Sequence, residues 1–255
     1  MTKSFRLISR LEIKGLNVVK GINMEGLRVV DFPEKLARKY FSDGIDEIIL
    51  SDIVASLYGR NHLFKLVEKV SKEVSIPIVA GGGIRSINDI DMLLKSGADK
   101  ISINTHAVKN PKLIKEAALK FGSQCIIVEI HAKFKSPDNW QVLVENGREP
   151  TSLNLVKWIK KVEELGAGEI LLISVDKDGT FKGLDKNLIN LTFDKASIPI
   201  IYGGGFNDVD EIKNYVEKYN IDAVSISHAL HFNKVKIGNI KKELIKSKIE
   251  VRPFK

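Results

Sequence analysis

The sequence predicts a single domain, residues 1–255, folded as one (β/α)8 TIM barrel with a two-fold, half-barrel repeat. First, eight short apolar runs, each of strand length, alternate with longer segments of helical periodicity. Second, a phrase is repeated: IPIVAGGG begins at Ile76 and IPIIYGGG begins at Ile198, 122 residues later. Third, no linker or low-complexity tract divides the 255 residues, a length that suits one barrel.

The expected strands lie at residues 5–13, 47–53, 76–80, 100–104, 124–130, 169–175, 198–202 and 223–227. Three of the intervening helices have recognisable ends. Pro33 suits a first helical position, and Ser86 suits the N-cap of a helix that stops at Gly97. A third helix is expected from Ser152 to Gly166. Long loops at 14–32 and 132–150 follow strands one and five, and WQVLVENG in the second is typical of a hairpin.

The half-length repeat extends beyond the glycine phrase. Glu47 and Glu169, in EIILSDI and EILLISV, are also 122 residues apart, as are Ile103 and Ser225. Apolar runs can recur by chance, but three features at the same offset favour two fused half-barrels of four βα units each.

Composition narrows the class of protein. Hydrophobic residues make up 44% and charged residues 28%, as in soluble globular proteins, and no apolar run approaches the ~20 residues of a membrane helix. The single cysteine, Cys125, excludes an intramolecular disulfide and suits a cytoplasmic location. The net charge of +8 fits either a lysine-rich surface or a field that favours an anionic substrate. Nucleic acid and membrane partners are not expected, because no basic cluster is interleaved with aromatics and no signal-peptide core is present.

The repeated glycines predict two phosphate sites. Glycine lets a phosphate approach backbone N–H groups, and active sites of barrels lie where the strands end. Tight turning alone is the alternative explanation. The candidate residues of the first site, after strands three and four, are Gly82, Gly83, Asn104 and Thr105. Those of the second, after strands six to eight, are Asp178, Gly179, Gly204, Gly205, Ser227 and His228.

Five stretches carry a resemblance to a known family: GGGIRSINDI, GADKISINTHAVKNP, FGSQCIIV, LGAGEILLISVDKDGT and IPIIYGGG. Over essentially the whole chain, the sequence resembles the cyclase (HisF) subunit family of imidazole glycerol phosphate synthase. The resemblance implies a barrel that takes ammonia from a glutaminase (HisH-type) partner and passes it to a bisphosphorylated ribonucleotide. The implied products are imidazole glycerol phosphate and an aminoimidazole carboxamide ribotide.

The resemblance implies an ammonia gate at the amino-terminal mouth of the barrel, made of two cations and two carboxylates. The matching residues, each near the start of an expected strand, are Arg6, Glu47, Lys100 and Glu169. Asp99 matches a residue that faces the glutaminase. Without the resemblance, charges at strand starts would be interpreted as solvated.

The catalytic positions depart from the family pattern. The family uses two aspartates, and here SRLEIKG places Glu12 at the first and VEIHAK places His131 at the second, while Lys20 matches. Glu12 and His131 could also be ordinary polar residues at the rim. Glu129 lies on the same face of the strand as His131, but deeper in the barrel. It stays a candidate for the missing catalytic carboxylate.

The second phosphate site also departs from the family. Tyr202 and Gly203 stand where the family has a small residue and serine, and His228 stands in place of a usual serine. A bulky ring and a lost hydroxyl predict a changed ligand end and a weaker site.

Two functions remain open. The first hypothesis is a specialised paralogue that still receives ammonia but serves another phosphorylated acceptor, for example in amidino-sugar formation on surface glycans, possibly with a third amidating enzyme. In its extreme form the barrel only conducts ammonia. The alternative is the ordinary histidine-pathway cyclase with unusual acids. Neither a metal nor a cofactor is expected.

Overall fold

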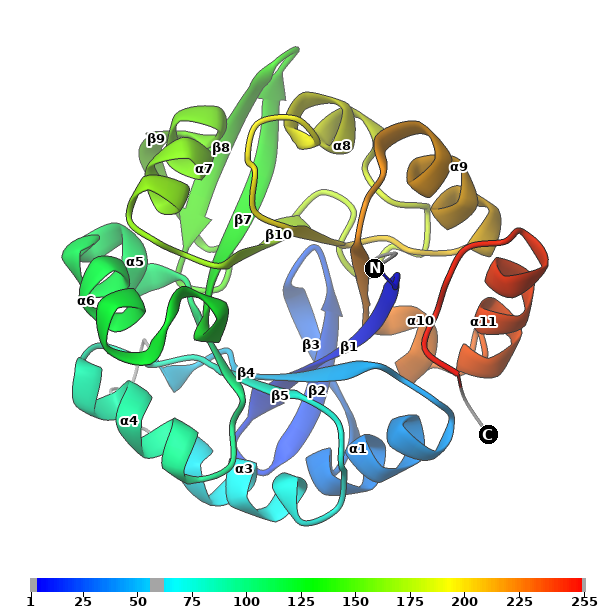
Figure 1. The fold of residues 1–255 in the computed structure, drawn as a ribbon, viewed down its shortest axis with the longest axis horizontal. Coiled ribbons are helices and arrows are strands. Elements are labelled where there is room, and N and C mark those ends of the chain that lie inside the picture. The colour runs from blue at the N-terminus through cyan, green and yellow to red at the C-terminus, as the bar shows by residue number, and fades with distance from the viewer. Residues whose placement is uncertain (1–3, 56–61, 254–255) are drawn as a thin grey trace.

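The computed structural model describes residues 4–55 and 62–253, and within them the chain forms a closed (β/α)8 barrel (Figure 1). Every neighbouring pair of barrel strands is parallel, and the last strand pairs with the first. The barrel strands, in order, are β1 (Arg6–Lys14), β4 (Glu47–Asp52), β5 (Ile78–Gly81), β6 (Lys100–Ile103), β7 (Ile126–Ser136), β10 (Glu169–Ser174), β11 (Ile200–Gly203) and β12 (Ala223–Ile226). The predicted fold class is therefore confirmed.

Helices surround the barrel, and the longer ones bury an apolar face against it. They are α1 (Pro33–Ser42), α3 (Leu63–Ser71), α4 (Ile87–Lys95), α5 (Thr105–Lys109), α6 (Lys112–Phe121), α7 (Leu155–Glu164), α8 (Lys186–Thr192), α9 (Val209–Tyr219), α10 (His228–His231) and α11 (Ile237–Lys246), with a 3-10 turn at Ser123–Cys125. Pro33 occupies the first position of α1, and Ser86 caps α4 in a capping box with Asp89.

The expected start of the third helix at Ser152 is wrong. Ser152 lies in a strand, and α7 begins after Asn154, whose side chain accepts a hydrogen bond from the N–H of Lys157. Asparagine is as good an N-cap as serine, so the local preference could not choose between the two positions.

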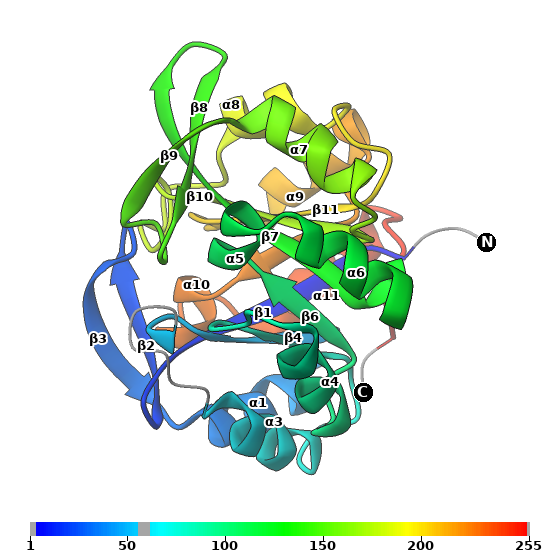
Figure 2. The same ribbon diagram turned by 90° about the vertical axis from the view of Figure 1, so that its left-hand side faces the viewer.

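Both long loops fold into antiparallel strands. The first contains β2 (Asn17–Ile22) and β3 (Glu25–Asp31); the second contains β8 (Asn139–Val144) and β9 (Glu149–Asn154), which extend β7. The expected hairpin at WQVLVENG is confirmed. Figure 2 shows both excursions on the same side of the barrel, where the strands end.

The barrel interior is layered, because alternate residues of each strand point inward. Charged residues begin several strands, and the next inward residues are apolar. This apolar layer, a buried cluster separate from the main core between barrel and helices, includes Ile8, Ile49, Val79, Ile127, Leu171, Ile201 and Ala223. Beyond it lie Arg10, Ser102 and Glu129, all buried. The interior is thus polar, apolar and polar again along the barrel axis.

Candidate active site

Four charged residues close a ring at the amino-terminal mouth. Arg6 Nη1 lies 2.9 Å from Glu47 Oε2, and Arg6 Nη2 contacts Glu169. Lys100 Nζ lies 3.1 Å from Glu47 and 3.0 Å from Glu169. Each cation therefore bridges both carboxylates, which compensates for partial removal of four charges from water. The structure brings the four predicted gate residues together; their role in conducting ammonia stays a prediction.

Asp99 lies on the same face, exposed, immediately before β6. Its carboxylate accepts a hydrogen bond from the backbone N–H of Ile78 at 2.8 Å. This contact ties the starts of β5 and β6 together, so Asp99 has a structural role besides its predicted place at a partner interface.

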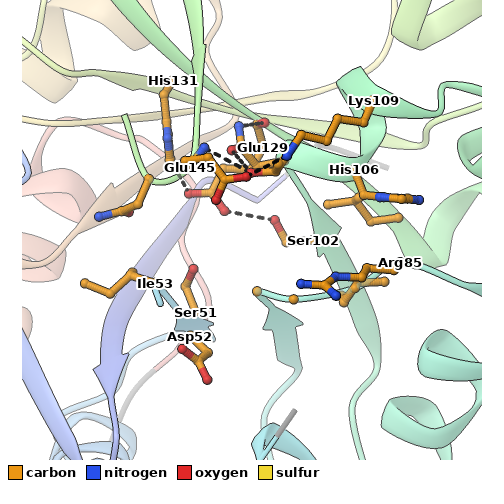
Figure 3. A pocket seen from close by; sticks show the side chains of 17 residues that line it. Ser51, Asp52, Ile53, Arg85, Ser102, His106, Lys109, Glu129, His131 and Glu145 are labelled. Carbon is orange, nitrogen blue, oxygen red and sulfur yellow. Dashed lines mark hydrogen bonds and ion pairs between the residues drawn. The ribbon is translucent and has the colours of Figure 1, made fainter. Parts of the chain in front are cut away.

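A cavity of about 220 Å³ opens at the carboxyl ends of β4 to β7 (Figure 3). Its lining includes the four residues predicted for the first phosphate site, Gly82, Gly83, Asn104 and Thr105. Gly82 has φ +100°, and a Cβ there would meet the carbonyl oxygen of Asp52 at 2.1 Å, so glycine is required for this turn.

Four charged side chains around this cavity were not predicted from the sequence. Arg85 and Lys109 supply positive charge, while Asp52 and Glu145 supply carboxylates. Lys109 Nζ lies 2.9 Å from Glu145 Oε1. Burial raises the pKa of Asp52, although two backbone N–H groups partly offset it. The cavity is therefore mixed in charge and not uniformly cationic.

A buried ion-pair network fills the barrel beneath the cavity rim. Lys20 Nζ lies 2.9 Å from Glu12 Oε1 and 2.6 Å from Asp178 Oδ2. Arg10 contacts Glu12, and its Nη2 lies 3.6 Å from Asp178. The structure thus joins the predicted Glu12, Lys20 and Asp178, and adds Arg10, whose side chain is 1% exposed.

Burial alone would raise the pKa of Glu12, but the charges of Lys20 and Arg10 and their hydrogen bonds lower it. Burial likewise opposes the charge of Arg10, and Glu12, Asp178 and Glu129 together raise its pKa. Glu12 is therefore an ionised carboxylate held by two cations, poorly suited to donate a proton.

His131 is held by Glu129, which lies two residues deeper on the same face of β7. His131 Nε2 lies 2.8 Å from Glu129 Oε1, and Arg10 Nη1 lies 3.0 Å from the same oxygen. Ser102 Oγ donates to the other oxygen of Glu129 at 3.3 Å. Burial would raise the pKa of Glu129, but its contacts with His131 and Arg10, and the hydrogen bond from Ser102, lower it to about 2.

The second predicted phosphate site is nearly closed. Its residues Asp178, Gly179, Gly204, Gly205, Ser227 and His228 do lie together, but the cavity between them is only about 10 Å³. That is room for about one water molecule. Phe181 and Phe206 also line it, with the Phe181 ring centroid 6.2 Å from that of His228. Ser227 donates its hydroxyl to the carbonyl of Arg10 at 2.9 Å.

The expectation that Tyr202 alters this site is wrong. Tyr202 is buried in the main core between barrel and helices, and its hydroxyl lies 3.2 Å from that of Thr192 in α8. Because strand faces alternate, Tyr202 points outward while its neighbour Gly203 points inward. The inward space is occupied by Ile173, whose Cδ1 would lie 2.4 Å from a Cβ at Gly203.

Arg10 was missed, although the sequence contains a signal for it. SRLEIK places two charges, Arg10 and Glu12, on one face of a strand whose residues from Leu7 to Ile13 are all buried. Charges in such a strand need partners. The partners come from β7 and from the segment after β10, and a single sequence does not show which distant strands lie opposite.

The fold and the site define the class: a TIM-barrel protein of the enzyme type, with its pocket at the carboxyl ends of the strands. The family model described as "Histidine biosynthesis protein" matches residues 6–236. The subunit named "Imidazole glycerol phosphate synthase subunit HisF" from Legionella pneumophila is 50% identical over 206 residues, covering 81% of this chain and 97% of the relative. HisF subunits from Lactococcus lactis subsp. cremoris (strain SK11) and Bacillus cereus (strain Q1) are each 44% identical, over 98% and 97% of this chain and 97% and 98% of their own lengths.

The chain belongs to the HisF family of imidazole glycerol phosphate synthase. Within residues 4–55 and 62–253, none of the helices has the length and hydrophobicity needed to cross a bilayer.

Proposed function

We propose that this protein is the ammonia-receiving barrel subunit of a glutamine amidotransferase pair. The observation that carries the proposal is the four-charge ring, which lies at the opposite end of the barrel from the pocket. A glutaminase of the HisH type would dock at the ring face, near Asp99. Ammonia would then cross the ring and the apolar layer and reach a phosphorylated acceptor at Gly83 and Asn104.

The comparisons favour the histidine-pathway acceptor. The relatives that share 44–50% identity are named subunits of imidazole glycerol phosphate synthase. On this proposal the chain is the cyclase subunit, which closes the imidazole ring of a bisphosphorylated ribonucleotide. Glu12, Lys20 and His131 would then be its catalytic residues.

Two observations favour a second candidate, a specialised paralogue with another acceptor such as a sugar of a surface glycan. Arg10 and Glu129 place a buried ion pair below His131, and Glu12 is already held by two cations. The nearly closed second glycine site would suit an acceptor with a single phosphate. A third amidating enzyme could then complete the reaction.

The test is co-expression with a HisH-type glutaminase. We expect a stable complex, and we expect Glu47→Ala or Lys100→Ala to lower the ratio of aminated product to glutamate released. Lys115→Ala, an exposed charge on α6, serves as the control. Failure of the glutaminase to bind, together with ring variants that behave like the wild type, would refute the proposal. Supplying the bisphosphorylated ribonucleotide and a nucleotide-free phosphorylated sugar in parallel separates the two acceptors.

A further inference from the structure

We propose that Glu129 is a positioning residue that holds His131 as the Nε2–H tautomer, leaving Nδ1 as the proton acceptor of the reaction. The inference deepens the proposed function, because it assigns a base to the same pocket. It concerns a pair, Glu129 and His131, whose contact the sequence did not predict.

The geometry fixes which ring nitrogen carries the hydrogen. His131 Nε2 lies 2.8 Å from Glu129 Oε1, and that oxygen also accepts from Arg10 Nη1 at 3.0 Å. A carboxylate held by a guanidinium is ionised, and an ionised carboxylate can only accept hydrogen bonds. Nε2 must therefore donate, and a neutral His131 carries its lone pair on Nδ1.

The His131 side chain is only 3% exposed, and its Nδ1 is buried. Among the described residues, Nδ1 has no hydrogen-bond partner. A buried acceptor without a partner is uncommon and indicates a ligand or a catalytic role. His131 lines the large cavity together with Ser102 and Glu129 (Figure 3). Nδ1 thus belongs to a ring that lines this cavity, the only large pocket at the strand ends in the described part of the chain.

The charges around His131 support the stabilisation of an added proton. Ion pairs join three carboxylates and two cations into one cluster, in which Arg10 contacts Glu12, Glu129 and Asp178, and Lys20 contacts Glu12 and Asp178. The formal charge of this cluster is therefore −1. Glu129 is the carboxylate of the cluster that contacts His131. An imidazolium formed at His131 would lie 2.8 Å from Glu129 Oε1 and would balance the formal charge of the cluster.

The proton transfer balances without a further reactant. Ammonia attacks a carbonyl carbon of the acceptor: its nitrogen lone pair forms the C–N bond, the carbon–oxygen π bond breaks with its electrons moving to the oxygen, and the nitrogen is left positively charged with a surplus proton. That N–H bond breaks, its electrons stay on the nitrogen, and the proton passes to Nδ1. The resulting imidazolium is stabilised by Glu129 and can later return the proton to a leaving group or to water.

Nitrogen NMR of selectively labelled histidine tests the tautomer on the whole chain, and it needs neither partner nor substrate. In neutral His131 we expect Nε2 to be protonated and Nδ1 bare. Glu129→Gln should change the tautomer populations, because the amide can donate as well as accept, whereas Asp52→Asn, another carboxylate of the cavity, should not. A wild-type His131 with Nδ1 protonated, or one that stays doubly protonated from acid to alkaline pH, would overturn the proposal.

The second readout is steady-state kinetics, measured with the acceptor that the co-expression test identifies. Glu129→Gln should lower kcat by about 10²-fold or more with little change in KM and shift the acidic limb of the pH profile. Unaltered kcat would overturn the role of Glu129. If Glu129→Gln does not fold, the wild-type spectrum still decides the tautomer. The tautomer can be confirmed even if the glutaminase does not bind, so failure of this inference and failure of the proposed function are distinguishable.

Discussion

Arg10 Nη1 lies 3.0 Å from Glu129 Oε1 in the middle of the barrel, where the two residues meet from opposite strands, β1 and β7. This ion pair separates the apolar layer from the pocket. It also links Glu12, Lys20 and Asp178 on one side with His131 on the other. The site is therefore one connected network of ion pairs and hydrogen bonds.

Arg10→Met should destabilise the fold strongly. The substitution leaves Glu129 and Glu12 buried with less compensation, and removing one partner of a buried ion pair costs about 3–5 kcal/mol. Urea unfolding measures the loss. Arg38→Ala is the control, because its pair with Glu73 lies at the surface and should cost no more than about 1 kcal/mol. Similar losses in the free energy of unfolding for both variants would show that the buried ion pairs of Arg10 contribute no more to stability than a surface pair.

His231 should make stability depend on pH. Burial and the charge of Lys20 lower the pKa of His231 to about 3, and Tyr40 lies 2.8 Å from its Nδ1. A depressed histidine pKa means that the unfolded state binds the proton first. The stabilisation is thus complete above the unfolded pKa of about 6.5 and decreases as pH falls towards about 3.

The expected loss from His231 between about pH 7 and about pH 5 is roughly 2 kcal/mol. His231→Phe removes the titrating group, so its free energy of unfolding should fall less over that interval. Any constant cost of losing the Tyr40 contact cancels in the comparison. Equal pH slopes for wild type and variant would contradict the assignment.

Phosphate or sulfate should occupy the first glycine site before the second. Gly82, Gly83 and Asn104 line an open cavity, whereas the second site has room for about one water molecule. A structure determined in sulfate, with an anion titration, should show binding at the second site at least about tenfold weaker, since one hydrogen bond to a charged group is worth that much. His228→Ser should reduce the difference. Equal occupancy in the wild type would count against a changed ligand end.

Turnover of the histidine-pathway substrate with free ammonia decides between the two acceptors. If the chain is specialised, its rate should be at least about 10²-fold below that of a relative with both aspartates, because a displacement of about 1 Å can cost that factor. Glu12→Asp combined with His131→Asp should recover part of the rate. Recovery should stay incomplete while Arg10 and Glu129 remain. A wild type that already reaches family rates would establish the cyclase and reject the specialised acceptor.

The sequence predicted the barrel because its strands and glycine turns are local features. Apolar runs, Pro33 and the Ser86 cap determine elements within a few residues. The four-charge ring was predicted only through the family resemblance, since Arg6 and Glu169 are distant in sequence. The outward direction of Tyr202 and the pairing of Arg10 with Glu129 depend on register and on which strands face each other, and neither is determined locally.

The charged layers of the barrel interior also make each half-barrel dependent on the other. The first half supplies Arg6, Glu47 and Lys100 to the mouth and Arg10, Glu12 and Lys20 to the centre, so each group has a surplus positive charge. Apart from His131, the second half supplies only carboxylates to both groups, namely Glu169, Glu129 and Asp178. A half-barrel expressed alone would therefore contain interior charged side chains without partners of opposite charge. Exchanging halves between relatives would succeed only where the two halves carry matching opposite charges.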